Sequence, residues 1–340
     1  MKKALLAILM LLTLTGCQKK NTEVLNVLNW SSYIPDEVIK DFEEETNIEV
    51  NYGTYSSNEE LLAKISASKE GTYDVIFPSD YMVELMKEKG YLEKIDKTKL
   101  SNYINLKSEY LNLEYDQGNN YSLPFLVASV FIAKNKNNII DDINSYNDLL
   151  NTEYKNNIVM LDDQRIVIGI ALLALGYDPN ETDESKLKET EEWLLKLKQN
   201  VKAFDSDSPK MLLISEEVDI GVIWNAEIAI AMNQNKSIEV IYPKEGTMIS
   251  IDNFAILKGT KNQENAYKFI NYLLREDVMA KIIEGYPYKN VNAKTDNILP
   301  SSYTSNVSAN FPKKILKNSY LVKNIGEKVK LYDQIWANIK

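Results

Sequence analysis

The sequence predicts an α/β protein of two wound domains, joined by two crossover segments, with a ligand cleft between them. Three observations support this class: the chain has 340 residues, short apolar runs alternate with amphipathic runs, and two longer extended runs separate the alternating blocks. A chain of this length forms two domains or one large one, and it buries a sizeable core without disulfides. Strand and helix patterns in alternation predict mainly parallel sheets covered by helices.

The first alternating block spans residues 24–90. Its apolar runs predict strands at 24–30, 48–55 and 73–77. Helices are expected to begin at Pro35, Ser57 and Pro78. Ser57 and Glu60 form a capping box, and Gly90 is a typical helix end. Ligands of wound sheets bind where a strand ends and the next helix begins, and residues 30–33 and 79–81 occupy such positions.

The second block lies between two extended runs that we expect to cross between the lobes, at 121–133 and 247–257. Its predicted strands are 158–161, 220–224 and 238–242. Helices are predicted from 162 to 176, at 186–198, from 226, at 266–274, at 278–283 and over 319–339, with a loop at 286–312. Lobe 1 is therefore expected to comprise 24–126 and about 252–300, and lobe 2 to comprise 127–251 and about 301–340.

The chain begins with a leader. Lys2 and Lys3 precede a short apolar run at 4–14, and Cys17, the only cysteine, follows small residues. The run is too short to cross a bilayer, so it is typical of a secretory signal. Its end resembles a bacterial lipobox, which implies a signal peptide at 1–16, lipid on Cys17 and a tether at 17–23. An ordinary cleaved signal with an incidental cysteine is the alternative.

Composition narrows the chemistry. The chain contains no histidine, and a lipidated Cys17 leaves no free thiol, so the sequence argues against Cys/His catalysis and His/Cys metal sites. No metal and no cofactor are expected. The formal charge of −10 argues against nucleic acid as a partner and is compatible with a cationic ligand. The 21 tyrosines and 4 tryptophans suggest a binding surface of polar-tipped rings.

Short motifs, in order along the chain, carry a family resemblance. They are Asn29-Trp30-Ser31-Ser32-Tyr33-Ile34-Pro35, Ser57-Asn58-Glu59, Tyr73-Asp74-Val75-Ile76-Phe77-Pro78-Ser79, Tyr121-Ser122-Leu123-Pro124, Asp162-Asp163-Gln164-Arg165, Ile223-Trp224-Asn225, Tyr242-Pro243-Lys244-Glu245-Gly246 and Gly285-Tyr286-Pro287. Over residues 24–340 this series resembles the bacterial spermidine/putrescine-binding proteins. The resemblance implies the two-lobed periplasmic-binding-protein fold in a monomeric, exported, membrane-anchored lipoprotein, periplasmic or at the cell surface. Such a protein is not an enzyme: it captures a polyamine and delivers it to the permease subunits of an ABC importer.

The resemblance also implies a ligand site. A polyamine is a methylene chain with two or more ammonium groups, so its binder needs carboxylates at the ammonium positions and rings along the methylenes. The implied rings are Trp30, Tyr33, Tyr81, Trp224 and Tyr286. The implied carboxylates are Asp163, Glu227 and Asp252, with Asp80 as a second choice. Hydrogen-bonding candidates are Ser31, Ser32 and Ser79. Helix capping is the alternative role for Asp163 and Ser79, and a helix-dipole contact is the alternative for Glu227.

Three departures from the family pattern leave the exact ligand open. Relatives often carry an acidic residue at position 32 and usually Glu at 166, and spermidine-preferring relatives can carry Trp at 250. This chain has Ser32, Ile166 and Ser250. The working hypothesis is a diamine or triamine, putrescine or spermidine, held by Asp163, Glu227 and Asp252. Other classes stay open: a binder of another small solute on the same fold, a polyamine sensor, or an enzyme that cleaves glycosides with a carboxylate pair.

Overall fold

The computed structural model describes residues 23–340, and the expectations for the leader, for Cys17 and for most of the tether lie outside them. Within these residues one sheet path runs in the order β2-β1-β3-β9-β4-β7-β5-β6, with β8 and β10 on β4 and β11 on β9. The strands are β1 (Glu23–Trp30), β2 (Ile48–Tyr55), β3 (Val75–Ile76), β4 (Ser122–Asn135), β5 (Ile158–Met160), β6 (Val201–Phe204), β7 (Ile220–Trp224), β8 (Ile238–Ile241), β9 (Thr247–Ile256), β10 (Lys289–Asn290) and β11 (Ser319–Leu321). The α-helices are α2 (Asp36–Thr46), α3 (Asn58–Ala67), α4 (Asp80–Glu88), α5 (Gln164–Ala174), α6 (Glu184–Leu197), α7 (Lys210–Ile214), α8 (Asn225–Gln234), α9 (Gln263–Leu273), α10 (Glu276–Gly285), α11 (Ser301–Thr304), α12 (Lys313–Leu316) and α13 (Val329–Ile339).

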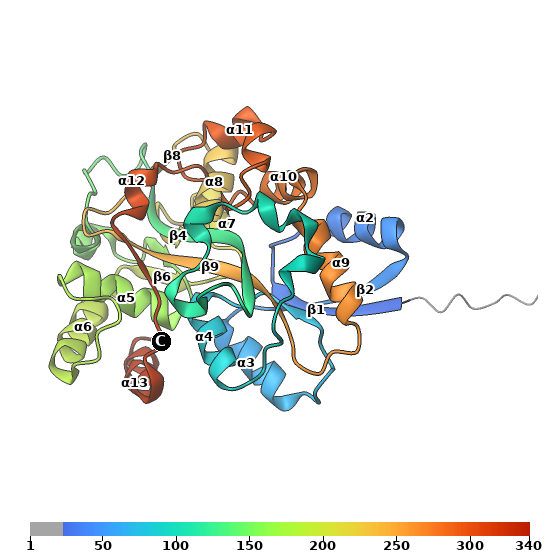
Figure 1. Ribbon diagram of the computed structural model, residues 1–340. Coiled ribbons are helices and arrows are strands. Elements are labelled where there is room, and N and C mark those ends of the chain that lie inside the picture. The colour runs from blue at the N-terminus through green and yellow to red at the C-terminus, as the bar shows by residue number, and fades with distance from the viewer. Residues whose placement is uncertain (1–22) are drawn as a thin grey trace, which may run out of the picture.

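The first lobe is built on a parallel β2-β1-β3 sheet, as the alternating pattern predicts (Figure 1). Helix α2 connects β1 to β2, α3 connects β2 to β3, and α4 follows β3. Val38 and Phe42 are the buried face of α2. Ser57 caps α3 by accepting a hydrogen bond from the backbone N–H of Glu60 at 3.1 Å. Each strand therefore delivers the chain to a helix start at the same edge of the sheet.

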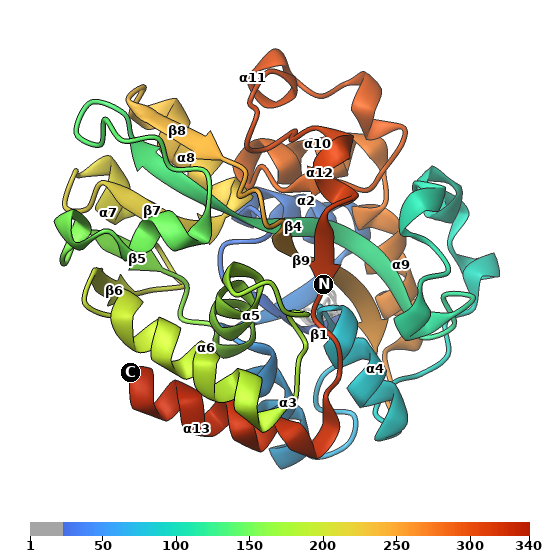
Figure 2. The same cartoon turned by 90° about the vertical axis from the view of Figure 1, so that its left-hand side faces the viewer.

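Two long strands, β4 and β9, connect the lobes, and every residue in both is buried. They run antiparallel: residues 122–129 of β4 pair with β9, and residues 130–134 pair with β7. The apolar cores separate at the same places. Ala128 and Ile251 pack in the first core, whereas Val130 and Met248 pack in the second. Both predicted crossings are thus confirmed as extended strands, and Figure 2 shows them passing between the lobes.

The chain passes between the two cores a third time, later along the sequence than the expected boundary near 300. Tyr303 and Ala309 pack in the first core, beyond the expected lobe boundary near 300, and Phe311 packs in the second. The predicted helix over 319–339 is wrong in its first part. Residues 319–321 form β11, which pairs with the start of β9, and the helix begins only at Val329, after Gly326 with its φ of +55°. The expected loop at 286–312 also contains β10 and α11.

Across 23–340, no helix is long and apolar enough to cross a membrane. Within that range, no group of three or more His, Cys, Asp or Glu side chains is arranged to hold a metal ion.

The turn before β9 gives a test of how the segment just before β11 packs. Gly246 has a φ of +100°, and a Cβ there would lie 2.5 Å from the backbone oxygen of Asn318. Gly176 has a φ of +81°, but a Cβ there would meet nothing within 4 Å. Gly176→Ala should lower the free energy of unfolding by about 1 kcal/mol, because alanine is strained in the left-handed conformation. Gly246→Ala should lower the free energy of unfolding by about 2 kcal/mol more, because it adds a backbone clash.

Urea unfolding of the two glycine variants, side by side, measures this difference. Equal losses in the two variants would contradict the close packing of residue 318 against the turn.

Candidate functional site

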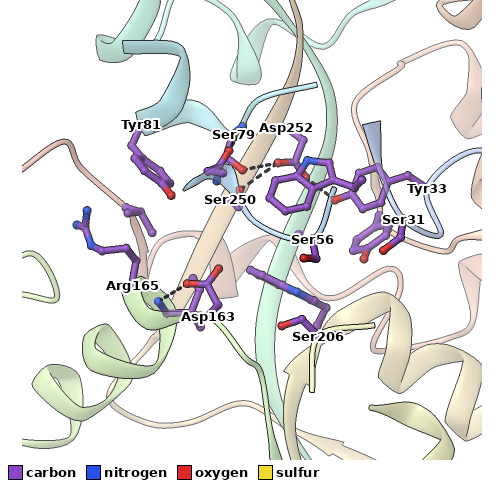
Figure 3. Close-up of a pocket in the computed structure, with 17 residues that line it drawn as sticks. Ser31, Tyr33, Ser56, Ser79, Tyr81, Asp163, Arg165, Ser206, Ser250 and Asp252 are labelled. Carbon is purple, nitrogen blue, oxygen red and sulfur yellow. Dashed lines mark hydrogen bonds between the residues drawn. The ribbon is translucent and has the colours of Figure 1, made fainter. Parts of the chain in front are cut away.

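A cavity lies between the lobes, where β1, β3, β5 and β7 end and the crossings β4 and β9 pass (Figure 3). It encloses about 660 Å³, part of which is open to solvent. The lining residues are Trp30, Ser31, Tyr33, Ser56, Asn58, Ser79, Tyr81, Ala128, Asp163, Arg165, Ile166, Ser206, Trp224, Ser250, Asp252, Tyr288 and Val322. Its mixture of rings with a few polar groups is typical of a small-molecule site.

Asp252 is held in the cavity wall by hydrogen bonds from three hydroxyl groups. It lies on β9 and is 2% exposed. Its carboxylate accepts hydrogen bonds from the hydroxyls of Tyr33, Ser79 at 2.7 Å and Ser250 at 3.3 Å. A carboxylate offers about four lone-pair positions, so three hydroxyl donors leave capacity for one further donor. Burial raises the pKa of Asp252 to about 6, and the hydrogen bonds from Ser79, Tyr33 and Ser250 oppose this shift.

Rings from the first lobe surround this carboxylate. The indole N–H of Trp30 donates to the backbone oxygen of Phe77 at 2.8 Å, which fixes the ring plane. Trp30 also contacts Tyr55, with ring centroids 4.8 Å apart. Tyr33 packs on Tyr288 at 4.7 Å. These rings are held in place by their neighbours, so a ligand that contacts them meets only a small ordering cost.

The second lobe contributes a carboxylate and an indole, each at the start of a helix. Asp163 is the N-cap of α5 and accepts from the backbone N–H of Ile166 at 3.0 Å. This bond uses only one carboxylate oxygen, and in Figure 3 the other points into the cavity. Burial and, to a lesser degree, the charge of Glu59 raise the pKa of Asp163 to about 6. Trp224 ends β7 directly before α8.

The two lobes meet at the ends of the cavity. On one side the guanidinium of Arg165 lies between the rings of Tyr81 at 5.6 Å and Tyr332 at 5.0 Å. Tyr81 belongs to the first lobe and Arg165 to the second, so this stack bridges the cleft. On the other side, the hydroxyl of Ser31 donates to Asp207 at 3.4 Å. The cavity is therefore bounded by contacts between the lobes as well as by each lobe's own residues.

The structure brings eight of the twelve candidate ligand residues to the cavity wall: Trp30, Ser31, Tyr33, Ser79, Tyr81, Asp163, Trp224 and Asp252. Two of the others point elsewhere. Ser32 is exposed, with a φ of 57°, in the turn after β1. Tyr286 ends α10 and packs on the outside of the first core. Its place on the wall is taken by Tyr288, whose N–H bonds back to the oxygen of Tyr286 at 2.7 Å in a three-residue turn.

The other two candidates are acidic and already have partners. Asp80 is 1% exposed and accepts from the backbone N–H groups of Tyr81 at 2.7 Å and Ile251 at 3.0 Å, which ties α4 to β9. Burial raises the pKa of Asp80 to about 8. Glu227 forms an ion pair with Lys210, with both carboxylate oxygens within 3.0 Å of the ammonium. Neither carboxylate faces the cavity.

Sequence reasoning missed several wall residues: Ser56, Asn58, Ala128, Arg165, Ser206, Tyr288 and Val322. Asn58 and Arg165 stand inside motifs that carried the resemblance, so their motif membership was an available signal. Tyr288 stands two residues beyond another motif. Nothing in the local sequence marks Ala128, Ser206 or Val322, because their place on the wall depends on how the two lobes meet.

A cleft between two α/β lobes, walled by rings and two carboxylates, defines a solute-binding protein. The family model of the bacterial extracellular solute-binding proteins matches residues 37–310, and the chain belongs to this family. The family and fold are those of solute-binding transport proteins.

Individual relatives agree with this assignment. The chain is 36% identical to the spermidine/putrescine-binding periplasmic protein of Salmonella typhimurium, covering 97% of this chain and 95% of that one. It is 37% identical to spermidine/putrescine-binding periplasmic protein 1 of Haemophilus influenzae, covering 96% and 95%. A solved structure from Listeria monocytogenes, assigned to a spermidine/putrescine ABC transporter, is 32% identical with a TM-score of 0.90, covering 93% and 98%. The resemblance expected from the motifs is confirmed.

The buried carboxylate of Asp252 should make the stability of the unliganded protein depend on pH. Asp252 has a folded-state pKa of about 6 against an ordinary value of 3.8. Its ionisation therefore destabilises the fold above pH 6, and this cost fades as the pH falls from 6 towards 4. Asp252→Asn should raise the free energy of unfolding at pH 8 by on the order of 2 kcal/mol, and by much less at pH 4.5.

Denaturant unfolding at the two pH values measures the gain. Asp142→Asn, at an exposed acid, is the control and should change little at either pH. A loss of stability in Asp252→Asn that is the same at both pH values would contradict the assigned cost.

Proposed function

We propose that this protein binds a polyamine, putrescine or spermidine, outside the cytoplasm and delivers it to the permease subunits of an ABC importer. The observation that carries the proposal is the buried carboxylate of Asp252, with one acceptor position left towards a cavity of aromatic rings. The names of the relatives support the same ligand class. The expected lipid anchor on Cys17, the monomeric state and the two lobe ranges belong to this proposal.

In the proposed complex one ammonium group lies at Asp252 and another at Asp163. The methylenes between them pass along Trp30, Tyr33, Trp224 and Tyr288. Ser31, Ser79 and Tyr81 complete the contacts. Charge-assisted hydrogen bonds contribute about 1.5–3 kcal/mol each and cation–π contacts about 0.5–2 kcal/mol each. A micromolar complex needs about 8 kcal/mol net, so this set of contacts is sufficient after ordering costs.

Binding itself is the first test. Titration calorimetry with putrescine, cadaverine and spermidine should give heat with at least one of them. Asp252→Asn should weaken that binding roughly 10- to 150-fold, because the ammonium loses its charged partner. Asp142→Asn removes the same charge at an exposed position and should leave affinity within twofold. No heat with any of the three amines would end the proposal.

A matched pair of tyrosines tests the assigned wall. Tyr288→Ala should weaken amine binding roughly 2- to 30-fold through loss of a ring face, whereas Tyr286→Ala should have a smaller effect. The same calorimetric titration measures both. A larger loss in Tyr286→Ala than in Tyr288→Ala would show that the ligand contacts a surface other than this cavity.

A further inference from the structure

A buried ion pair lies beside the cavity and is not explained by the fold alone. The ammonium of Lys210, the first residue of α7, lies 2.8 Å and 3.0 Å from the two carboxylate oxygens of Glu227 in the first turn of α8. The Lys210 side chain is 16% exposed and that of Glu227 is 8% exposed. This is the most deeply buried carboxylate–ammonium pair among the ion pairs of residues 23–340.

The pair stands directly behind the cavity wall. Glu227 follows the wall residue Trp224 by three positions, and Lys210 follows the wall residue Ser206 by four. The carboxylate of Glu227 is also among the charges that raise the pKa of the wall residue Tyr288. The two charges are thus close to the ligand space without being part of its surface.

A buried carboxylate needs a cation, and here the chain supplies its own. Both oxygens of Glu227 already accept from Lys210, whose charge neutralises the carboxylate, so a ligand ammonium would gain a full ion pair only by displacing Lys210. Displacement would leave the ammonium of Lys210 buried without a partner, which is costly. Glu227 is therefore not available as a third anionic position for the ligand, although its place in the sequence marked it as a candidate.

We propose that Lys210 determines specificity by occupying Glu227, so that the cavity accepts a ligand with two ammonium groups in preference to one with three. This inference rests on the proposed function. Asp163 and Asp252 are the only carboxylates among the wall residues described, and the one cation on that wall, Arg165, disfavours a further ammonium near it. Positions 32 and 166 carry Ser32 and Ile166, which supply no additional charge.

The ligand series on the unmodified protein is the first test. Calorimetry should give putrescine or cadaverine an affinity at least tenfold higher than that of spermidine, because the Glu227 carboxylate is already occupied by Lys210 and does not meet a third ammonium. Spermidine binding as tightly as the best diamine, or more tightly, would overturn the inference and leave the proposed function standing. Absence of binding by all three amines would instead refute the proposed function.

Variants of Lys210 and Glu227 test whether this ion pair causes the preference for a diamine. Lys210→Ala frees the Glu227 carboxylate and leaves space for an ammonium, so the ratio of spermidine affinity to putrescine affinity should rise about tenfold. The double variant Lys210→Met with Glu227→Gln removes both charges at similar volume and should keep the unmodified ratio within threefold. An unchanged ratio in Lys210→Ala, or an equal rise in the double variant, would show that Glu227 is not the masked partner.

Removing Lys210 leaves a buried charge and lowers stability, so folding must be followed by thermal melting. In Lys210→Ala, spermidine should raise the melting temperature about as much as putrescine does, whereas in the unmodified protein putrescine should raise it more. If this variant does not fold, the double variant and the unmodified ligand series still decide: a spermidine preference in either one overturns the inference.

Discussion

The carboxylate of Asp252 is the point on which the rest of the site depends. It lies on β9, one of the two strands that pass between the lobes, and it is fixed by hydroxyl groups from the turn after β1, from the start of α4 and from β9 itself. The first lobe's sheet therefore converges on this one group. Because the group is almost fully buried, its charge is costly in the absence of a cation. A cationic ligand removes that cost, so the same burial that destabilises the empty protein strengthens the bound state.

Much of the fold follows from local sequence patterns. The parallel β2-β1-β3 sheet, the two long crossings and the helices that begin after each strand all rest on periodicity and caps, which depend on neighbours only a few residues apart. Residues 319–321 illustrate the limit. Their alternation is too short to separate from the helical pattern that follows, and they become a strand only because the start of β9 offers an unpaired edge. The exact place of the third crossing, near Ala309 and not near 300, is likewise set by packing between distant segments.

The candidate site, like the fold, has some features that local sequence predicts and others that depend on tertiary packing. Trp30, Trp224 and Asp163 stand where a strand meets a helix, so sequence position alone predicts that they reach the cleft. Glu227 has an equally favourable position, but its partner Lys210 comes from another helix, and no local pattern reports that pairing. Tyr286 and Tyr288 differ by two residues, and a three-residue turn decides which ring reaches the wall. Sequence reasoning finds the positions, whereas the tertiary structure assigns their partners.

The charges around the cavity carry more information about the ligand than the cavity's size does. A cleft of a given volume can hold many different small molecules, but each buried charge favours a partner of opposite charge. The two carboxylates Asp163 and Asp252 line the cavity, while Asp80 and Glu227 lie off its wall and are already bonded to groups of the chain itself. A change in ligand preference within this family therefore does not require a new carboxylate on the wall. A basic residue on a neighbouring helix, placed so that it neutralises an existing carboxylate from behind, changes the number of cations that the cleft can hold.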